Sequence, residues 1–194
     1  MVVTGLVLAA GGSSRLGEPK QLLPFRGRTL LDATLDVARS CDFDQILVTL
    51  GGALDEVRSK VDLTRVEIVE NVAYGTGCSS SIVTALDRVD PRADGIVLLL
   101  GDQPGVTAGD VRALVREAAG QPLGVCRYDD GRGHPLWLGR AVFDDLRTLH
   151  GDKGVWKLLE SGRYTVREVA VAGPVPQDVD DRDDYLALLA QEAG

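Results

Sequence analysis

Short runs of apolar, β-branched residues alternate along this chain with longer amphipathic stretches, and this alternation limits the possible folds more than any other feature. Two of the runs, Gly5–Ala9 and Gly95–Leu100, are almost uninterrupted apolar sequence. Strands of this kind are buried on both faces, as in a parallel sheet that helices cover on either side. We expect strands over Gly5–Ala9, Gln45–Leu50, Val66–Val69, Gly95–Leu100, Leu123–Cys126 and Tyr164–Val171.

The stretches between these runs have helical periodicity. Leu31, Leu35 and Ala38 fall on one face of a helix, and Thr107 can cap a helix that has Asp110 in its first turn. Strands and helices that alternate predict an α/β, three-layer, Rossmann-like fold with a mainly parallel sheet, and the absence of a clear linker predicts one domain over residues 1–194. We expect helices over Leu30–Ser40, Ser79–Val89, Ala108–Ala119, Arg140–Leu149, Gly154–Ser161 and Asp181–Gln191.

Charge and composition exclude several classes of function. The 194 residues carry a net charge of −8, which argues against a nucleic-acid or membrane-surface partner because both need a basic surface. No apolar run approaches the roughly 18–20 residues that cross a bilayer. Three scattered cysteines and no evident signal peptide fit a reducing compartment, so we expect a cytoplasmic protein.

The densest chemical signal is the stretch LAAGGSSRLGEPKQ, which starts at Leu8 and places Arg15 and Lys20 in a glycine- and serine-rich loop after a buried strand. Glycines let backbone N–H groups turn toward an anion, and the two cations suit phosphate oxygens. The stretch matches neither the P-loop nor the dinucleotide pattern. The alternative is a glycine-rich turn with two surface cations. The nucleotide-binding residues expected here are Leu8, Ala9, Ala10, Gly11, Gly12, Ser13, Ser14, Arg15 and Lys20.

Two carboxylates are candidate metal ligands. Asp102 follows the apolar strand Gly95–Leu100, where a carboxylate can hold Mg²⁺ against a triphosphate, although it can also cap the next helix. Asp180 is the second candidate, within a run of aspartates that can simply cap the last helix.

Three consecutive serines, Ser79, Ser80 and Ser81, open a predicted helix. Their hydroxyls and the helix N–H groups suit a phosphate or a base edge, but plain N-capping is the alternative.

These residues are similar to the motifs of the MobA-like nucleotidyltransferases. The first stretch resembles the family signature LAxGxSxRMGxxK. Further along the chain, Gly101–Pro104 resembles the family's metal motif and Gly77–Ser81 its nucleotide loop. Gly133–Pro135 resembles its GHP or GNP segment, and Asp178–Asp180 its late D-[IV]-D motif.

Within the family, the chain most resembles the molybdenum cofactor cytidylyltransferases. Ala10 stands where guanylyltransferases carry a glycine, and LAAG is the form associated with CTP. Two features depart from this branch. Leu16 replaces the usual Met or Phe, and Pro19–Gln21 resembles the methylerythritol-phosphate cytidylyltransferases, whose metal motif is DAARP-like instead of the GDQP found here.

The resemblance implies transfer of CMP from CTP to the terminal phosphate of molybdopterin, with release of pyrophosphate. Arg15, Lys20 and Asp102 would be catalytic, Mg²⁺ or Mn²⁺ would sit on Asp102 and Asp180, and His134 would contact the acceptor. A molybdenum hydroxylase would be a transient partner. Two alternatives remain open: nucleotidyl transfer to another acceptor (guanylyl transfer to molybdopterin, or transfer to a sugar or polyol phosphate), and a non-catalytic protein that delivers the cofactor.

Overall fold

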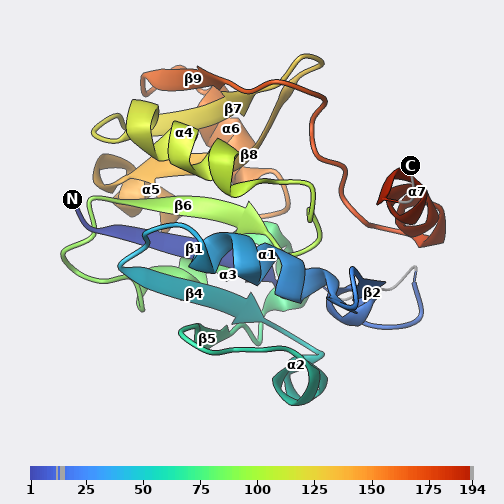
Figure 1. Cartoon of the computed structure of the whole chain (residues 1–194). Coiled ribbons are helices and arrows are strands. Elements are labelled where there is room, and N and C mark those ends of the chain that lie inside the picture. The colour runs from blue at the N-terminus through green and yellow to red at the C-terminus, as the bar shows by residue number, and fades with distance from the viewer. Residues whose placement is uncertain (12, 14–15, 193–194) are drawn as a thin grey trace.

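A seven-stranded sheet runs through the centre of the molecule in the order β5-β4-β1-β6-β8-β7-β9 (Figure 1). The structure is a computed structural model that describes residues 1–11, 13 and 16–192. Strand β8 runs antiparallel to both of its neighbours, and the other neighbouring pairs are parallel. The strands are β1 Val3–Ala9, β4 Gln45–Leu50, β5 Glu67–Glu70, β6 Gly95–Leu100, β7 Leu123–Arg127, β8 Arg132–Gly139 and β9 Val166–Ala170, with a separate hairpin of β2 Pro24–Phe25 and β3 Arg28–Thr29.

Helices cover both faces of this sheet, so the three-layer α/β fold predicted from the sequence is confirmed. Helices α1 and α4 pack on one face, and α3, α5 and α6 pack on the other (Figure 1). Capping boxes start α1 at Thr29 and α4 at Thr107, as expected for Thr107. The helices are α1 Leu30–Arg39, α2 Leu54–Lys60, α3 Cys78–Leu86, α4 Ala108–Ala118, α5 Phe143–Leu146, α6 Gly154–Glu160 and α7 Arg182–Glu192, with 3₁₀ turns η1 Lys20–Leu22, η2 Tyr74–Thr76 and η3 Arg140–Val142.

Strand β8 is the main element that the sequence analysis missed. Its sequence contains Pro135, which cannot donate a ladder hydrogen bond and so argues against a central strand. The structure accommodates this proline beside a register shift, where Cys126 pairs with Gly133 instead of continuing the β7–β8 register. The buried side chain of Trp137 then packs across Gly95 of β6, where a β-carbon would clash with the indole ring.

Two helices also differ from expectation. The seven-residue α2 was not predicted, because so short a segment has little periodicity to detect. The helix expected over Arg140–Leu149 is a 3₁₀ turn followed by the single α-helical turn of α5.

The C-terminal segment packs beside the carboxyl end of the sheet (Figure 1). Val179, Tyr185 and Leu188 form a small apolar cluster with Leu23, Phe25 and Leu30. The Tyr185 hydroxyl donates to the carbonyl of Pro24 over 2.6 Å, and the Val179 N–H donates to the carbonyl of Asp102 over 3.1 Å. These contacts bring a segment from the end of the sequence to the loop that follows β6.

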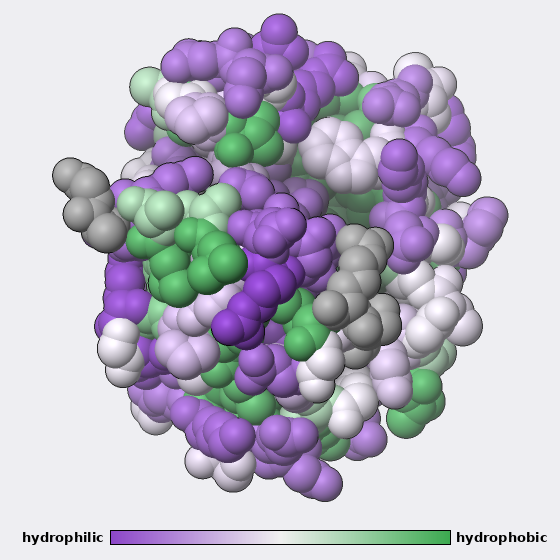
Figure 2. All heavy atoms as spheres, turned by 90° about the vertical axis from the view of Figure 1, so that its right-hand side faces the viewer, coloured by the Kyte–Doolittle hydropathy of each residue, from purple (hydrophilic) through white to green (hydrophobic). Residues whose placement is uncertain are grey.

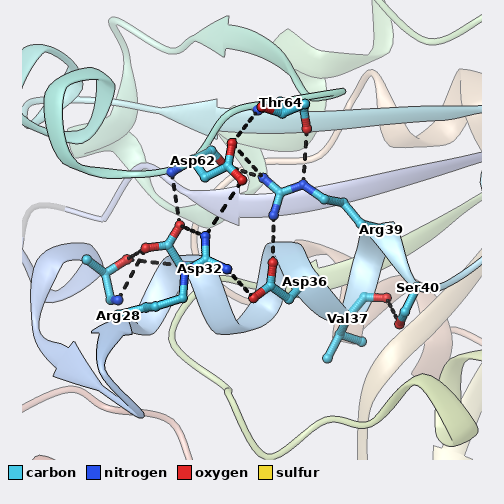
Figure 3. A network of polar contacts seen from close by, with 9 residues as sticks. Arg28, Asp32, Asp36, Val37, Arg39, Ser40, Asp62 and Thr64 are labelled. Carbon is cyan, nitrogen blue, oxygen red and sulfur yellow. Dashed lines mark hydrogen bonds and ion pairs between the residues drawn. The ribbon is translucent and has the colours of Figure 1, made fainter.

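A polar network fixes the start of α1 (Figure 3). Asp32 is 3% exposed and accepts hydrogen bonds from the Thr29 hydroxyl over 2.8 Å and from the Asp62 N–H over 3.0 Å. Arg28 reaches both Asp32 and Asp36. The buried Asp32 therefore joins the helix N-terminus to a loop thirty residues away, whereas Asp36 makes ion pairs at the surface.

We predict that Asp32→Ala lowers the free energy of unfolding by about 1–3 kcal/mol, because it removes one half of a capping box and leaves the partly buried donors of Thr29 and the loop at Asp62 without their acceptor. Urea denaturation measures this change. Asp36→Ala is the matched control, and it should cost at most about 1 kcal/mol because exposed ion pairs contribute little. Equal effects of the two substitutions would show that the buried capping bonds add nothing.

No helix in the described part of the chain combines the length and the apolar character needed to cross a bilayer.

Candidate functional site

A cleft of about 560 Å³ opens at the carboxyl ends of β1 and β6. The side of the molecule where these strands end, which faces the viewer in Figure 2, is hollowed and largely hydrophilic. Ligands of open α/β sheets bind at this edge. The lining residues come from segments 8–11, 13, 20–21, 74–78, 81, 100–102, 152 and 180.

Three charged side chains meet in this cleft. The Lys20 ammonium donates to Asp102 and, over 3.0 Å, to Oδ1 of Asp180. Burial by itself lowers the pKa of Lys20, but the charges and hydrogen bonds of the two carboxylates outweigh it and raise the pKa above its ordinary value. Lys20 is therefore a fixed cation held between two carboxylates from distant parts of the chain.

Most residues predicted for the first loop line the cleft, namely Leu8, Ala9, Ala10, Gly11, Ser13 and Lys20. The Ser13 hydroxyl accepts a hydrogen bond from the Lys20 N–H over 2.8 Å, which closes the loop upon itself. The predicted residues Gly12, Ser14 and Arg15 lie outside the described residues.

The three serines differ in their surroundings. Ser79 and Ser81 are both buried, but only Ser81 of the three serines is among the residues that line the cleft. The Asn71 side-chain amide donates to the hydroxyls of Ser80 and Ser81 over 2.9 and 3.0 Å. Of the three, Ser81 is thus the one placed to meet a ligand in the cleft.

The first N–H groups of α3 already have partners within the protein. Asp152 accepts a hydrogen bond from the Cys78 N–H over 3.1 Å, and the Gly151 carbonyl accepts one from the Ser79 N–H over 3.0 Å. The idea that this helix terminus offers free donors to a phosphate therefore fails at its first two residues.

His134 does not line the cleft. It lies in β8, is 8% exposed and packs edge-on against Trp156 with 5.7 Å between the ring centroids. Burial lowers its pKa to about 4, so the imidazole is neutral at pH 7. His134 belongs to β8, the strand that the sequence analysis missed.

Two residues of the site fall within motifs noted in the sequence but were given no role there. The buried Gln21 donates through Nε2 to the carbonyls of Ala9 and Gly11, over 2.6 and 3.1 Å, and so fixes the start of the loop that follows β1. Asp178 lies near the carboxylate pair, and its removal from water, then the charges of Asp102 and Asp180, raise its pKa to about 6. Gln21 directly follows Lys20, and its place in the segment Pro19–Gln21 was the signal that could have pointed to it.

The carboxylates of Asp102 and Asp180 suit a hard divalent cation. Both contact one positive charge, the Lys20 ammonium. Within the described ranges no group of three or more His, Cys, Asp or Glu side chains is arranged to hold a metal. A cation at this site would therefore complete its coordination with water or substrate oxygens, as Mg²⁺ usually does.

The chain is similar to known proteins over most of its length. A family model described as the MobA-like NTP transferase domain matches residues 5–169. The chain belongs to this family. The resemblance seen in the sequence and the nucleotidyltransferase fold are thereby confirmed.

Individual proteins match this chain over nearly all of its length. The nicotine blue oxidoreductase of Paenarthrobacter nicotinovorans is 29% identical, with 96% of each chain covered. The crystal structure of the Mycobacterium tuberculosis Rv0371c homologue from Mycobacterium sp. strain JC1 is 56% identical, with a TM-score of 0.92 and coverage of 98% of this chain and 96% of that one. The manganese complex of Rv0371c from M. tuberculosis is 52% identical, with a TM-score of 0.87 and coverage of 98% and 99%.

Proposed function

We propose that this MobA-like protein transfers CMP from CTP to the terminal phosphate of molybdopterin and releases pyrophosphate. The observation that carries the proposal is the contact of Lys20 with both Asp102 and Asp180, in a cleft bordered by the loop after β1. Phosphoryl transfer requires a protein to position the reacting groups and to neutralise their charge, and one cation and two carboxylates at the end of parallel strands can do both.

In this reaction an oxygen of the acceptor phosphate attacks the α-phosphorus of CTP. A new P–O bond forms, the bond between the α-phosphorus and the bridging oxygen breaks, and the electron pair leaves with pyrophosphate. A phosphate nucleophile is already ionised at pH 7, so the protein needs no general base. The side chains have to hold the reacting groups in line and stabilise negative charge.

We assign a part in this chemistry to each segment of the cleft. Backbone N–H groups of Gly11–Ser14 hold the triphosphate, Arg15 stabilises the leaving pyrophosphate and Lys20 contacts the α-phosphate. Mg²⁺ or Mn²⁺ on Asp102 and Asp180 supplies further charge neutralisation when bound. The manganese complex of a 52% identical relative supports the use of a divalent ion.

The choice of CTP and molybdopterin rests on finer features. Ala10 is 4% exposed and lines the cleft, where a purine needs more room than a pyrimidine. His134 remains our candidate for an acceptor contact, although it is 8% exposed and does not line the main cleft. A molybdenum hydroxylase is the partner that the cytosine dinucleotide form of the cofactor implies.

Family membership alone does not set the reaction, because a 29% identical relative is named an oxidoreductase. The assignment of the reaction therefore depends on the residues of the site.

The first prediction concerns Lys20. In the metal-free protein its ammonium contacts Asp102 and Asp180, the two carboxylates that we assign to the metal. Lys20→Met should therefore lower the Kd for Mn²⁺ by about tenfold or more, because the metal no longer has to displace a largely buried ion pair with Asp102 and a more exposed one with Asp180. The same variant should lose nucleotidyl transfer, because a phosphate-directed charge is gone.

Titration calorimetry or the EPR signal of free Mn²⁺ measures this affinity. Lys60→Met, which removes an exposed lysine on α2, is the matched control and should leave the Kd unchanged. An unchanged or weaker affinity in Lys20→Met would mean that Lys20 and the metal do not share the two carboxylates.

The second prediction tests the reaction itself. With Mg²⁺ and molybdopterin present, CTP should release pyrophosphate and yield the cytosine dinucleotide form of the cofactor, detected by mass spectrometry. Asp102→Asn should fold normally and lower kcat/KM by about 100-fold or more, because it keeps the shape of the side chain and removes its charge. Asp87→Asn, an exposed aspartate at the end of α3, is the matched control.

The alternatives give different results in the same assay. Product from GTP would indicate guanylyl transfer, and turnover with methylerythritol phosphate or a sugar phosphate would indicate a different acceptor. Bound cofactor without pyrophosphate release from any NTP would contradict the enzyme assignment and support a delivery role.

The third prediction concerns base choice. Ala10→Gly should shift the ratio of kcat/KM for CTP and GTP toward GTP, because the methyl group narrows the space beside the base. Paired kinetics of the wild type and the variant give this ratio. An unchanged ratio would remove Ala10 as a selectivity element.

A further inference from the structure

The side chain of Tyr74 lies across two consecutive glycines at the end of β4. A β-carbon on Gly51 would come within 2.7 Å of Cγ of Tyr74, and one on Gly52 within 2.8 Å of its hydroxyl oxygen. The ring therefore runs along the Gly51–Gly52 backbone, in space that any larger residue would fill. Tyr74 nevertheless remains 40% exposed, which is high for a large side chain in close contact with backbone.

The loop that carries Tyr74 is held in place by hydrogen bonds. The Asn71 N–H donates to the Leu50 carbonyl over 2.8 Å, and the Asn71 side chain accepts from the Ala73 N–H over 2.9 Å. The Thr76 N–H closes the turn on the Ala73 carbonyl over 2.9 Å. The ring is thus positioned before any ligand arrives, which reduces the entropy cost of binding.

The ring borders three hollows of the surface. It lines the main cleft, a hollow of about 500 Å³ over Gly51–Glu56 and Glu70–Val72, and a hollow of about 370 Å³ against Gly17–Pro19. A tyrosine that only shielded the core would be covered by its neighbours. Tyr74 instead presents an aromatic surface at the rim of the cleft.

The position of Tyr74 relative to the first loop indicates what it meets. The Ala10 carbonyl oxygen lies 2.7 Å from the place that a β-carbon on Gly51 would take, so Ala10, Gly51 and the Tyr74 ring are neighbours. Ala10 and Tyr74 both line the main cleft. The charged group of Lys20, Asp102 and Asp180 suits the phosphates, which leaves the aromatic and apolar wall for the flat, uncharged part of the nucleotide.

We propose that Tyr74 is a nucleotide-binding residue whose ring forms the wall against which the nucleobase of the NTP packs. This inference rests on the proposed nucleotidyl transfer. It assigns a part in nucleotide binding to a residue outside the loop that follows β1. Base–aromatic contacts of this kind tolerate any base, because every base has a π-face. Tyr74 would therefore supply affinity for a base, and Ala10 would select among bases by size.

Binding measurements on two ligands test the proposal. The Kd for CTP and for inorganic triphosphate, each with Mg²⁺, is measured by calorimetry on the wild type, Tyr74→Leu and Tyr74→Phe. Tyr74→Leu should weaken CTP binding by about 5- to 150-fold, the factor that a base–aromatic contact is worth, and should leave triphosphate binding unchanged. Tyr74→Phe should restore CTP binding, because no hydrogen bond to the Tyr74 hydroxyl is found among the residues that the structure covers. Circular dichroism and Tm verify the fold of each variant.

The outcomes separate this inference from the proposed function. Unchanged CTP affinity in Tyr74→Leu, or an equal loss for CTP and triphosphate, would overturn the role of Tyr74 while nucleotidyl transfer stands. A wild type that binds another NTP more tightly, with the loss in Tyr74→Leu seen for that nucleotide, would support Tyr74 and overturn the choice of CTP. A wild type that binds no NTP would overturn both.

Discussion

The Lys20 ammonium lies between two carboxylates that come from distant parts of the sequence. Asp102 follows the central strand β6, and Asp180 precedes the last helix. Asp102 is partly buried and Asp180 is about half exposed, and two carboxylates that contact the same ammonium would repel one another without a cation between them. The free protein meets that requirement with its own lysine, and in our account a divalent ion takes over this position when the nucleotide binds.

The rest of the fold brings these three groups together. The parallel pairing of β1 with β6 ends both strands at one edge, which places the loop with Lys20 beside Asp102. The apolar cluster of Val179, Tyr185 and Leu188 with residues of Leu23–Leu30 then holds the C-terminal segment over that edge. The site therefore depends on contacts between residues that lie about 150 positions apart in the sequence. A substitution in this apolar cluster would move Asp180 relative to Asp102.

The sequence predicted the features that depend on local patterns. Continuous apolar runs located β1 and β6, helical periodicity located α1 and α4, and the residue types of Lys20, Asp102 and Asp180 indicated the charged group of the cleft. It failed where tertiary contacts override local preference: β8 contains a proline and pairs through a register shift. It also could not show that Asp152 and Gly151 already satisfy the first N–H groups of α3, or that Tyr74 lies on Gly51 and Gly52, because these contacts join loops that are distant in sequence.

The central claim is that Asp102, Asp180 and Lys20 form one cation-dependent site for a nucleotide. A crystal structure with Mn²⁺ and a non-hydrolysable CTP analogue tests it most directly, since the anomalous signal of manganese locates the ion without ambiguity. Our account predicts a manganese peak between the carboxylates of Asp102 and Asp180, with the Lys20 ammonium moved onto a phosphate oxygen. A manganese peak elsewhere, with both Lys20 ion pairs intact, would contradict it.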